Sequence, residues 1–278
     1  MFSREFEFDG ISKKEFPFIY EKIFYFKKLL SLPNVVYEVR NGIVYLVING
    51  LKFTIKTKEE IFILSEIFVD DSYKLFSSRP YIFIDVGLNA GFTTLYFAND
   101  PSMIKAYGFE LFSDTLNQAK VNIGLNPRLA EKIETFVLGL GKEDKRVELE
   151  YSYKFKGNVG VHGITKHLIS NGLADDIERK EVTIRRSSDV LSPIIKRHPD
   201  ESIVLKLDCE GSEYDILDEL SSSFVLKEID ILLIEWHFQG YEKLVKVLLK
   251  NGFGSIVHGK NTDDVGILTA FNQKNNGT

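Results

Sequence analysis

Three carboxylates lie within six residues of the chain, at Asp208, Glu210 and Glu213, directly after the apolar run Ile203–Leu207. Carboxylates at a strand end can orient an acceptor group and remove its proton. Oxygen ligands of this kind also bind divalent metals such as Mg²⁺. A third interpretation is structural, because Glu210 and Glu213 would offset the macrodipole at the start of the following helix.

The next apolar run ends in Glu235, Trp236 and His237. His237 is a plausible proton acceptor, because an unperturbed imidazole has a pKa near 6.5. A metal cage usually draws ligands from several loops, whereas the three acids lie in one segment, so we predict no bound metal; a divalent metal remains the alternative. We predict three catalytic residues, Asp208, Glu210 and His237. We also predict two residues that contact the acceptor, Glu213 and His162, of which His162 lies in a glycine-bearing segment.

A second segment, Phe83–Thr93, runs from an apolar strand through a glycine-containing turn into a helix. Open parallel sheets bind ligands at the carboxyl ends of their strands. Gly87 would permit a sharp turn, and Gly91 would let the helix start close to a ligand. The dinucleotide fingerprint is not met, because Asn89 and Phe92 occupy its third and sixth positions, and no Gly-Lys-Ser/Thr follows to make a P-loop.

The same turn suits S-adenosylmethionine (SAM), whose sulfonium and amino-acid tail can be served by Asp85 and by backbone carbonyls. Glu110 ends the next apolar run, about 20 residues past the turn, where an acid can accept hydrogen bonds from both ribose hydroxyls. Alternatively, Asp85 caps backbone N–H groups and Glu110 is a solvated strand-end charge. Together, the turn and Glu110 predict a nucleoside-binding site.

Short apolar runs alternate with amphipathic stretches from Tyr81 onward, which is typical of a parallel sheet with helices on both faces. A closing hairpin is expected at Phe253–His258 and Gly266–Phe271. Residues 142–199 interrupt the alternation and are interpreted as an insertion over the carboxyl end of the sheet. Its glycines predict a mobile loop, and four basic residues are expected to meet an anionic acceptor: Lys154, Lys156, Arg185 and Arg186.

Residues 1–78 are predicted to form a small N-terminal α+β subdomain, and residues 79–278 the main domain. Helical spacing predicts a helix over Lys13–Leu30. Asn41-Gly42 and Asn49-Gly50 separate three apolar runs and suit two-residue hairpin turns, in which both residues need positive φ. The expected strands and the helix after them are Val35–Val39, Ile43–Ile48, Leu51–Ile55 and Lys58–Phe68.

The main domain resembles the FkbM family of SAM-dependent methyltransferases. The matching segments are Phe83-Ile-Asp-Val-Gly-Leu-Asn-Ala-Gly-Phe92, Gly108-Phe-Glu110 with Asn122 and Asn126, and Leu205-Lys-Leu-Asp-Cys-Glu-Gly-Ser-Glu213. The resemblance covers roughly residues 59–271. Two positions depart from the family pattern, where Leu111 stands for a common proline and Leu88 for a common alanine, and neither change removes a polar contact.

The resemblance implies a doubly wound, Rossmann-like class I methyltransferase sheet and methyl transfer to a hydroxyl oxygen, typically of a sugar or natural product. The acceptor would be a small molecule or a glycan, such as a polysaccharide precursor. The competing interpretations are an NAD-dependent oxidoreductase and a non-catalytic SAM-fold binding protein. The predicted cofactor contacts are Asp85, Gly87, Asn89, Gly91, Phe92, Glu110, Leu111, Gly139 and Asp208.

Composition narrows the class of protein. The net charge of -5 argues against a general nucleic-acid partner, which usually needs a basic face. A single cysteine, Cys209, fits a reducing cytoplasm, and its two acidic neighbours make it a poor nucleophile. Residues 1–10 show no signal-peptide core, and no apolar run approaches the roughly 20 residues needed to cross a bilayer. The sequence leaves the oligomeric state open.

Overall fold

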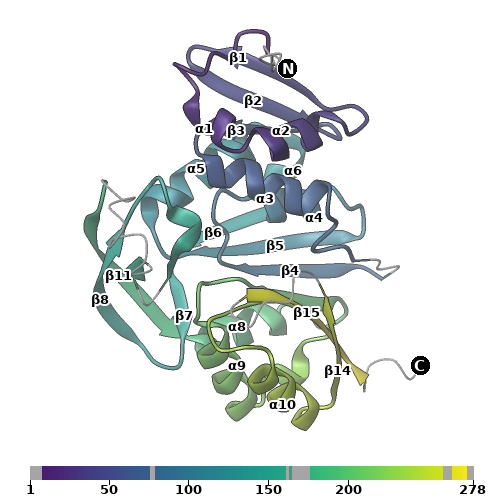
Figure 1. The fold of residues 1–278 in the computed structure, drawn as a ribbon. Helices are drawn as coiled ribbons and strands as arrows, with labels where there is room; N and C mark the ends of the chain where they lie inside the picture. Colours follow the sequence, from purple (N-terminus) through teal and green to yellow (C-terminus); the bar gives the residue numbers. More distant parts are fainter. Residues whose placement is uncertain (1–7, 76–78, 161–162, 165–175, 259–264, 274–278) are drawn as a thin grey trace.

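The computed structural model describes residues 8–75, 79–160, 163–164, 176–258 and 265–273. Its centre is a seven-stranded sheet in the order β14-β15-β13-β12-β4-β5-β6 (Figure 1). The strands are β4 (Tyr81–Val86), β5 (Met103–Glu110), β6 (Ile133–Val137), β12 (Ser202–Leu207), β13 (Ile231–His237), β14 (Phe253–His258) and β15 (Val265–Asn272). β15 is antiparallel to both of its neighbours, as the predicted closing hairpin requires.

The chain reverses its direction across the sheet between β4 and β12. From β4 it proceeds to β5 and β6, then crosses back to add β12 and β13 on the other side of β4. This is a doubly wound sheet, and the crevice beyond the carboxyl ends of β4 and β12 is its topological switch point. The predicted class I methyltransferase architecture is therefore confirmed.

Helices cover both faces of the sheet (Figure 1). One layer contains α3 (Lys58–Phe68), α4 (Phe92–Ala98), α5 (Ser113–Gly124) and the short α6 (Pro127–Ala130). The opposite layer contains α8 (Ser187–Lys196), α9 (Glu213–Ser222), the 3₁₀ turn η2 (Val225–Glu228) and α10 (Glu242–Lys250). β4 is buried along its whole length and serves both layers, because Tyr81 and Phe83 pack in one core cluster and Ile82 and Ile84 in the other.

The N-terminal part forms a three-stranded antiparallel sheet of β1 (Val36–Arg40), β2 (Ile43–Ile48) and β3 (Leu51–Ile55). All four turn residues at Asn41-Gly42 and Asn49-Gly50 have positive φ, so the two predicted hairpin turns are confirmed. The predicted helix over Lys13–Leu30 is instead two short helices, α1 (Pro17–Glu21) and α2 (Ile23–Leu30), with a break at Lys22.

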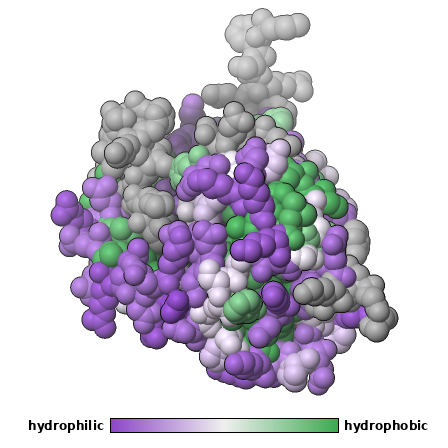
Figure 2. All heavy atoms as spheres, turned by 90° about the horizontal axis from the view of Figure 1, so that it is seen from below, coloured by the Kyte–Doolittle hydropathy of each residue, from purple (hydrophilic) through white to green (hydrophobic). Residues whose placement is uncertain are grey.

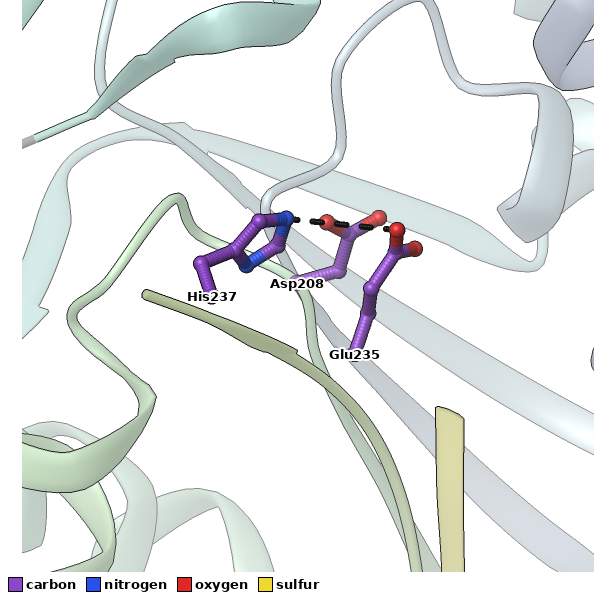
Figure 3. A group of neighbouring side chains, drawn as sticks. All are labelled: Asp208, Glu235 and His237. Carbon is purple, nitrogen blue, oxygen red and sulfur yellow. Dashed lines mark ion pairs between the residues drawn. The ribbon is translucent and has the colours of Figure 1, made fainter. Parts of the chain in front are cut away.

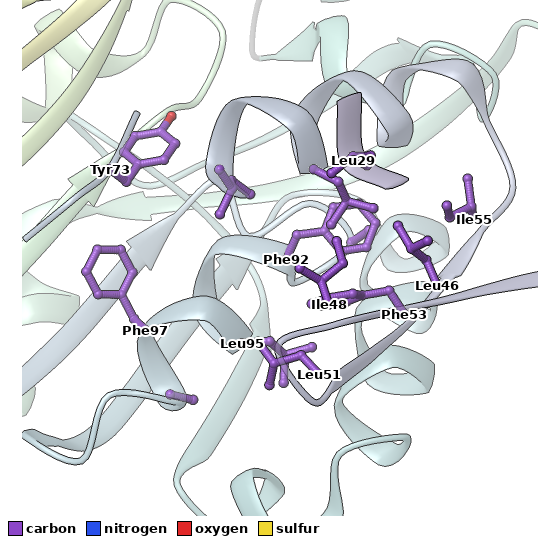
Figure 4. Close-up of a cluster of buried hydrophobic side chains, with 14 of the residues drawn as sticks. Leu29, Leu46, Ile48, Leu51, Phe53, Ile55, Tyr73, Phe92, Leu95 and Phe97 are labelled. Carbon is purple, nitrogen blue, oxygen red and sulfur yellow. The ribbon is translucent and has the colours of Figure 1, made fainter. Parts of the chain in front are cut away.

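This N-terminal sheet shares its hydrophobic core with the main sheet. Figure 4 shows Leu46, Ile48 and Phe53 packed beside Phe92 and Leu95 of α4. The rings of Phe53 and Phe92 meet edge-to-face, with centroids 5.4 Å apart. Residues before position 58 therefore bury apolar surface directly against the helix that follows the predicted cofactor turn.

The predicted insertion contains a second small sheet and a helix of the main fold. β7 (Gly139–Gly141) pairs with β11 (Glu178–Arg186), which pairs in turn with β8 (Lys145–Tyr151). The turn η1 (Lys156–Asn158) leads into β9 (Val159–Gly160) and β10 (Gly163–Ile164). Helix α8 was not expected, and its Leu191 and Ile194 are buried against the main sheet, so this segment belongs to the core fold.

The outer surface of the α8–α10 side is mostly hydrophilic, with separate apolar patches (Figure 2). Helix α10 illustrates why, because Leu244 and Leu248 are buried while Lys243, Lys246 and Lys250 are exposed. Within the described ranges, no helix is long and apolar enough to span a membrane.

Candidate active site

The switch point brings the predicted cofactor turn and the predicted catalytic segment into direct contact. The Asp208 N–H donates to the Val86 carbonyl at 3.0 Å, which joins the ends of β12 and β4. Gly87 has φ of +90°, and a Cβ on it would lie 1.7 Å from the Asp208 carbonyl oxygen. Glycine is required here for its backbone conformation and, above all, for this close approach.

The turn presents polar groups to the space above the sheet. Asn89 and Gly91 both adopt positive φ. The Asn89 N–H donates to Glu110 Oε2 at 2.9 Å, and the Phe112 N–H donates to Glu110 Oε1 at 3.0 Å. Asn89 Oδ1 is buried and has no hydrogen-bond partner in the described structure. Asn89 Oδ1 is therefore a hydrogen-bond acceptor still available in the turn.

Asp85 does not reach this space, contrary to its predicted contact with the cofactor. Its side chain is fully buried, where Oδ2 accepts a hydrogen bond from the Thr94 hydroxyl at 2.6 Å. Lys206 Nζ lies 3.0 Å from Oδ1, because the sheet register pairs Lys206 directly with Asp85. Asp85 therefore stabilises the base of the turn, and Lys206 links it to Asp208, whose Oδ2 is 3.1 Å from the same Nζ.

Four acidic side chains converge on His237. Figure 3 shows Asp208, Glu235 and His237 pointing toward one another from the ends of β12 and β13. His237 Nδ1 lies 3.1 Å from Glu213, and its Nε2 lies 3.7 Å from Glu210 and 3.9 Å from Glu235.

Tyr73, which sequence patterns did not single out, completes the cluster. It follows α3, far from the cluster in the chain, and its hydroxyl donates to Glu235 Oε2 at 2.8 Å and to Asp208 Oδ2 at 3.3 Å. The Glu235 side chain was likewise not predicted as catalytic. Its position beside His237 at the end of an apolar run was the available signal.

The protonation states differ from the expected ones. Burial lowers the pKa of His237, but its hydrogen bond with Glu213 and the charge of Glu210 outweigh this and raise the pKa to about 10. His237 is therefore an imidazolium at neutral pH and cannot accept a proton. Burial and the neighbouring Asp208 raise the pKa of Glu235 to about 7, which places a general base near neutral pH.

One cavity of about 960 Å³ connects the turn with the acidic cluster. Its far wall is formed by aromatic residues of the N-terminal helices, Phe24, Tyr25 and Phe62. The predicted cofactor residues that line the cavity are Gly87, Asn89, Phe92, Glu110, Leu111, Gly139 and Asp208; Asp85 and Gly91 lie behind it. A cavity of this volume is at the upper end of the range for small-molecule sites, so it has room for a cofactor and an acceptor.

Comparison with known proteins identifies the family. The model of the FkbM methyltransferase domain matches residues 85–257, which is more than half of the chain. The chain belongs to the FkbM methyltransferase family. The matched residues include the turn, the acidic residues after β12, and β13.

Individual relatives of this FkbM domain are distant. The AMB antimetabolite synthetase AmbE of Pseudomonas aeruginosa is 25% identical over 182 residues, which is 64% of this chain and 8% of AmbE. The structure of methyltransferase FkbM from Methylobacillus flagellatus aligns with a TM-score of 0.45 at 15% identity, over 75% of this chain and 47% of that one. The structure of M. capricolum TrmK with S-adenosylhomocysteine aligns with a TM-score of 0.38 at 11% identity, over 73% of this chain and 67% of the TrmK chain.

The predicted acceptor contact Glu213 has a different place in this FkbM domain. It is fully buried, and its carboxylate accepts the Cys209 and Gly211 N–H groups besides contacting His237. It orients His237 and the turn after β12, and it does not face the cavity. The other predicted contact, His162, lies outside the described residues.

The described part of the insertion lies against the carboxyl end of the sheet, as expected. A Cβ on Gly160 would lie 2.6 Å from Glu210 Cβ, so β9 approaches the Glu210 turn closely. Lys156, expected to meet an acceptor, is buried and bound to Glu60 and Gln118. Arg185 pairs with Asp144 and Arg186 with Glu219, and neither arginine lines the cavity.

Chelation tests whether the acidic cluster binds a metal. Asp208, Glu235 and His237 each offer a ligand atom, and these atoms lie within 4.8 Å of one another. The candidate metal ligands therefore come from two strand ends and not from one short segment, since β13 contributes two of them. However, a metal would have to displace the proton of His237 and compete with Lys206 for Asp208, and both effects weaken metal binding. We expect turnover to stay within about twofold after exhaustive chelation; activity that is lost and then restored by Mg²⁺ would contradict this.

The buried carboxyl groups predict a pH-dependent stability. Burial raises the pKa of Glu59 and Glu110 to about 7 and that of Glu210 to about 8. The folded state then binds protons more tightly than the unfolded chain, so this stabilisation is complete below about pH 4.5 and is lost as the pH rises through 7 to 8. A shift as large as that of fully buried Glu110 corresponds to about 3 kcal/mol. Denaturant unfolding at pH 5.5 and 8.0 should show the decline, and Glu110→Gln should reduce it.

Proposed function

We propose that this protein transfers the methyl group of SAM to a hydroxyl oxygen of a glycan precursor or related secondary metabolite. The observation that supports the proposal is that the residues predicted to bind the cofactor and the acidic residues at the strand ends line the same cavity. Asn89 and Glu110 belong to the turn and the end of β5, Asp208 and Glu235 belong to the ends of β12 and β13, and all four line the cavity.

The residues of the turn and the end of β5 fit SAM. The unsatisfied Asn89 Oδ1 is suited to accept a hydrogen bond from an ammonium group, and Glu110 is suited to accept hydrogen bonds from ribose hydroxyls. When bound, SAM supplies an electrophilic methyl group on a sulfonium centre. Leu111 and Leu138 add apolar surface to the cavity.

The residues at the ends of β12 and β13 fit a hydroxyl acceptor. A hydroxyl loses its proton during methylation, and Glu235 has the pKa of an effective base near neutral pH. Tyr73 and Lys206 hold Glu235 and Asp208 in place, and the His237 imidazolium stabilises the surrounding negative charge. Alignment of the hydroxyl with the methyl group supplies the remainder of the rate enhancement.

The aromatic wall supports a ring-shaped acceptor. Phe24 is 62% exposed, and Tyr25 packs edge-to-face against Phe62 with ring centroids 5.0 Å apart. Lys22 Nζ lies 5.2 Å from the Phe62 ring centroid. Aromatic faces bind the apolar face of a sugar ring, and neighbouring charged groups bind its hydroxyls, which is the combination that a glycan acceptor needs.

Glu110→Ala tests the cofactor half of the proposal. Loss of hydrogen bonds to a carboxylate costs on the order of 1.5–3 kcal/mol, so SAM affinity should fall roughly ten- to hundredfold by calorimetry. Glu134→Ala, at an exposed position on the neighbouring strand β6, is the matched control and should bind SAM normally. Unchanged affinity in a folded Glu110→Ala protein would refute the assignment.

Substrate tests address the transfer itself. SAM and NAD should be compared as ligands of the same preparation, because the SAM site predicts binding of SAM alone. S-adenosylhomocysteine formation should then be measured with a panel of sugar hydroxyls and, for contrast, sugar amines. Turnover only with amines would overturn O-methylation, and SAM binding without turnover on any acceptor would favour a non-catalytic role.

A further inference from the structure

A buried asparagine connects the cofactor turn to the N-terminal sheet. Asn122 lies on α5 and has no exposed surface. Its Nδ2 donates to the Ala90 carbonyl of the turn at 2.8 Å. Its Oδ1 accepts both the backbone N–H and the hydroxyl of Thr54 in β3, each at 2.9 Å. The two polar atoms of its side chain therefore connect the turn with β3.

Asn126 extends the same contact by one helical turn. Its Oδ1 accepts the Lys52 N–H at 2.9 Å, and its Nδ2 donates to the Lys52 carbonyl at 2.8 Å. Lys52 and Thr54 are two residues apart on β3, so their N–H groups point to the same side, away from β2. β3 is an edge strand, and the two asparagines complete its open edge.

The orientation of the Ala90 carbonyl is coupled to the conformation of the whole turn. Ala90 lies between Asn89 and Gly91, whose φ values of +50° and +80° set the direction in which the backbone groups point. The Asn89 N–H donates to Glu110, and Asn89 is one of the residues that line the cavity. A hydrogen bond that fixes the Ala90 carbonyl therefore also fixes the orientation of the groups predicted to contact the cofactor.

We propose that Asn122 is a positioning residue through which the N-terminal sheet sets cofactor affinity. The inference rests on the proposed SAM site and gives the N-terminal sheet a role in it. Docking of β3 orders Asn122, and Asn122 holds the turn in its ligand-binding conformation. Reciprocally, a ligand bound at the turn stabilises the contact between Asn122 and β3, because coupling between two binding equilibria is mutual.

A matched pair of variants separates positioning from general stability. Asn122→Asp keeps an acceptor for Thr54 but replaces the donor to Ala90 with an oxygen. Asn126→Asp makes the same change at a side chain that, among the described residues, hydrogen-bonds to Lys52 and to the Asn122 carbonyl. Both should lower the melting temperature. Asn122→Asp should also weaken SAM binding by about tenfold, while Asn126→Asp should leave SAM affinity within about twofold.

The wild-type protein provides a second test that does not depend on folding of a variant. Saturating SAM should slow hydrogen exchange of the Thr54 amide, which Asn122 holds, at least severalfold. Equal loss of SAM affinity in the two variants, or no protection of Thr54 by SAM, would overturn the inference. Wild-type protein that does not bind SAM would instead overturn the proposed function, so the two failures are distinguishable.

Discussion

Replacing Gly87 by alanine is expected to abolish SAM binding and to destabilise the fold. The added Cβ would lie 1.7 Å from the Asp208 carbonyl oxygen, so the ends of β4 and β12 must separate. Positive φ adds a conformational penalty of about 1 kcal/mol, and overpacking of this kind costs typically 1–3 kcal/mol more. Separation of the strand ends also displaces Asn89 and Asp208 together, and we expect SAM affinity to fall at least about a hundredfold.

Gly50 provides the matched control for this experiment. It has φ of +83°, but nothing lies within 4 Å of the position that a Cβ would take. Gly50→Ala should therefore show the backbone penalty alone, with normal SAM affinity. Calorimetry and thermal unfolding of both variants separate the two effects. Equal behaviour of the two variants would show that the contact with Asp208 is unimportant.

Replacing Glu235 by glutamine is expected to stop methyl transfer while leaving SAM affinity unchanged. Glutamine has nearly the same shape and retains an oxygen to accept the Tyr73 hydroxyl, but it cannot take up a proton. Loss of a general base typically reduces turnover by about 10²- to 10⁴-fold. Because the pKa of Glu235 is about 7, wild-type activity should rise as the pH increases through that value.

Glu210→Gln is the informative comparison, since burial raises the pKa of Glu210 to about 8 and its side chain lies near the same imidazole. If Glu235 is the base, Glu210→Gln retains most of its activity and keeps the rise near pH 7. Single-turnover rates with saturating SAM measure the transfer step directly. An active Glu235→Gln protein together with an inactive Glu210→Gln protein would reassign the base to Glu210.

Local sequence was sufficient to predict a structural feature wherever the physical requirement for that feature is itself local. The pairs Asn41-Gly42 and Asn49-Gly50 predicted their hairpins, because few other residues adopt positive φ at both positions without strain. Alternating apolar and amphipathic runs predicted the doubly wound sheet, and strand-end position placed Glu110 in the cavity. The limits of local patterns appear already at Lys22, where packing divides one predicted helix into two.

Tertiary structure decided the roles of the charged residues. Asp85 is withdrawn from the cavity because the register of β4 and β12 places Lys206 opposite it. Tyr73 joins the acidic cluster from 135 residues away from Asp208, a separation at which no sequence spacing applies.

The sequence by itself therefore determined the alternation of strands and helices in the main sheet, the glycine-containing turn and the acidic residues at the strand ends. Only the folded chain decided that His237 carries a proton and that Glu235 has a near-neutral pKa. The physical reason is that a pKa depends on burial and on every charge within a few ångströms. At this switch point those charges come from β12, from the turn that follows it, from the start of α9 and from β13, and only the folded sheet brings them together.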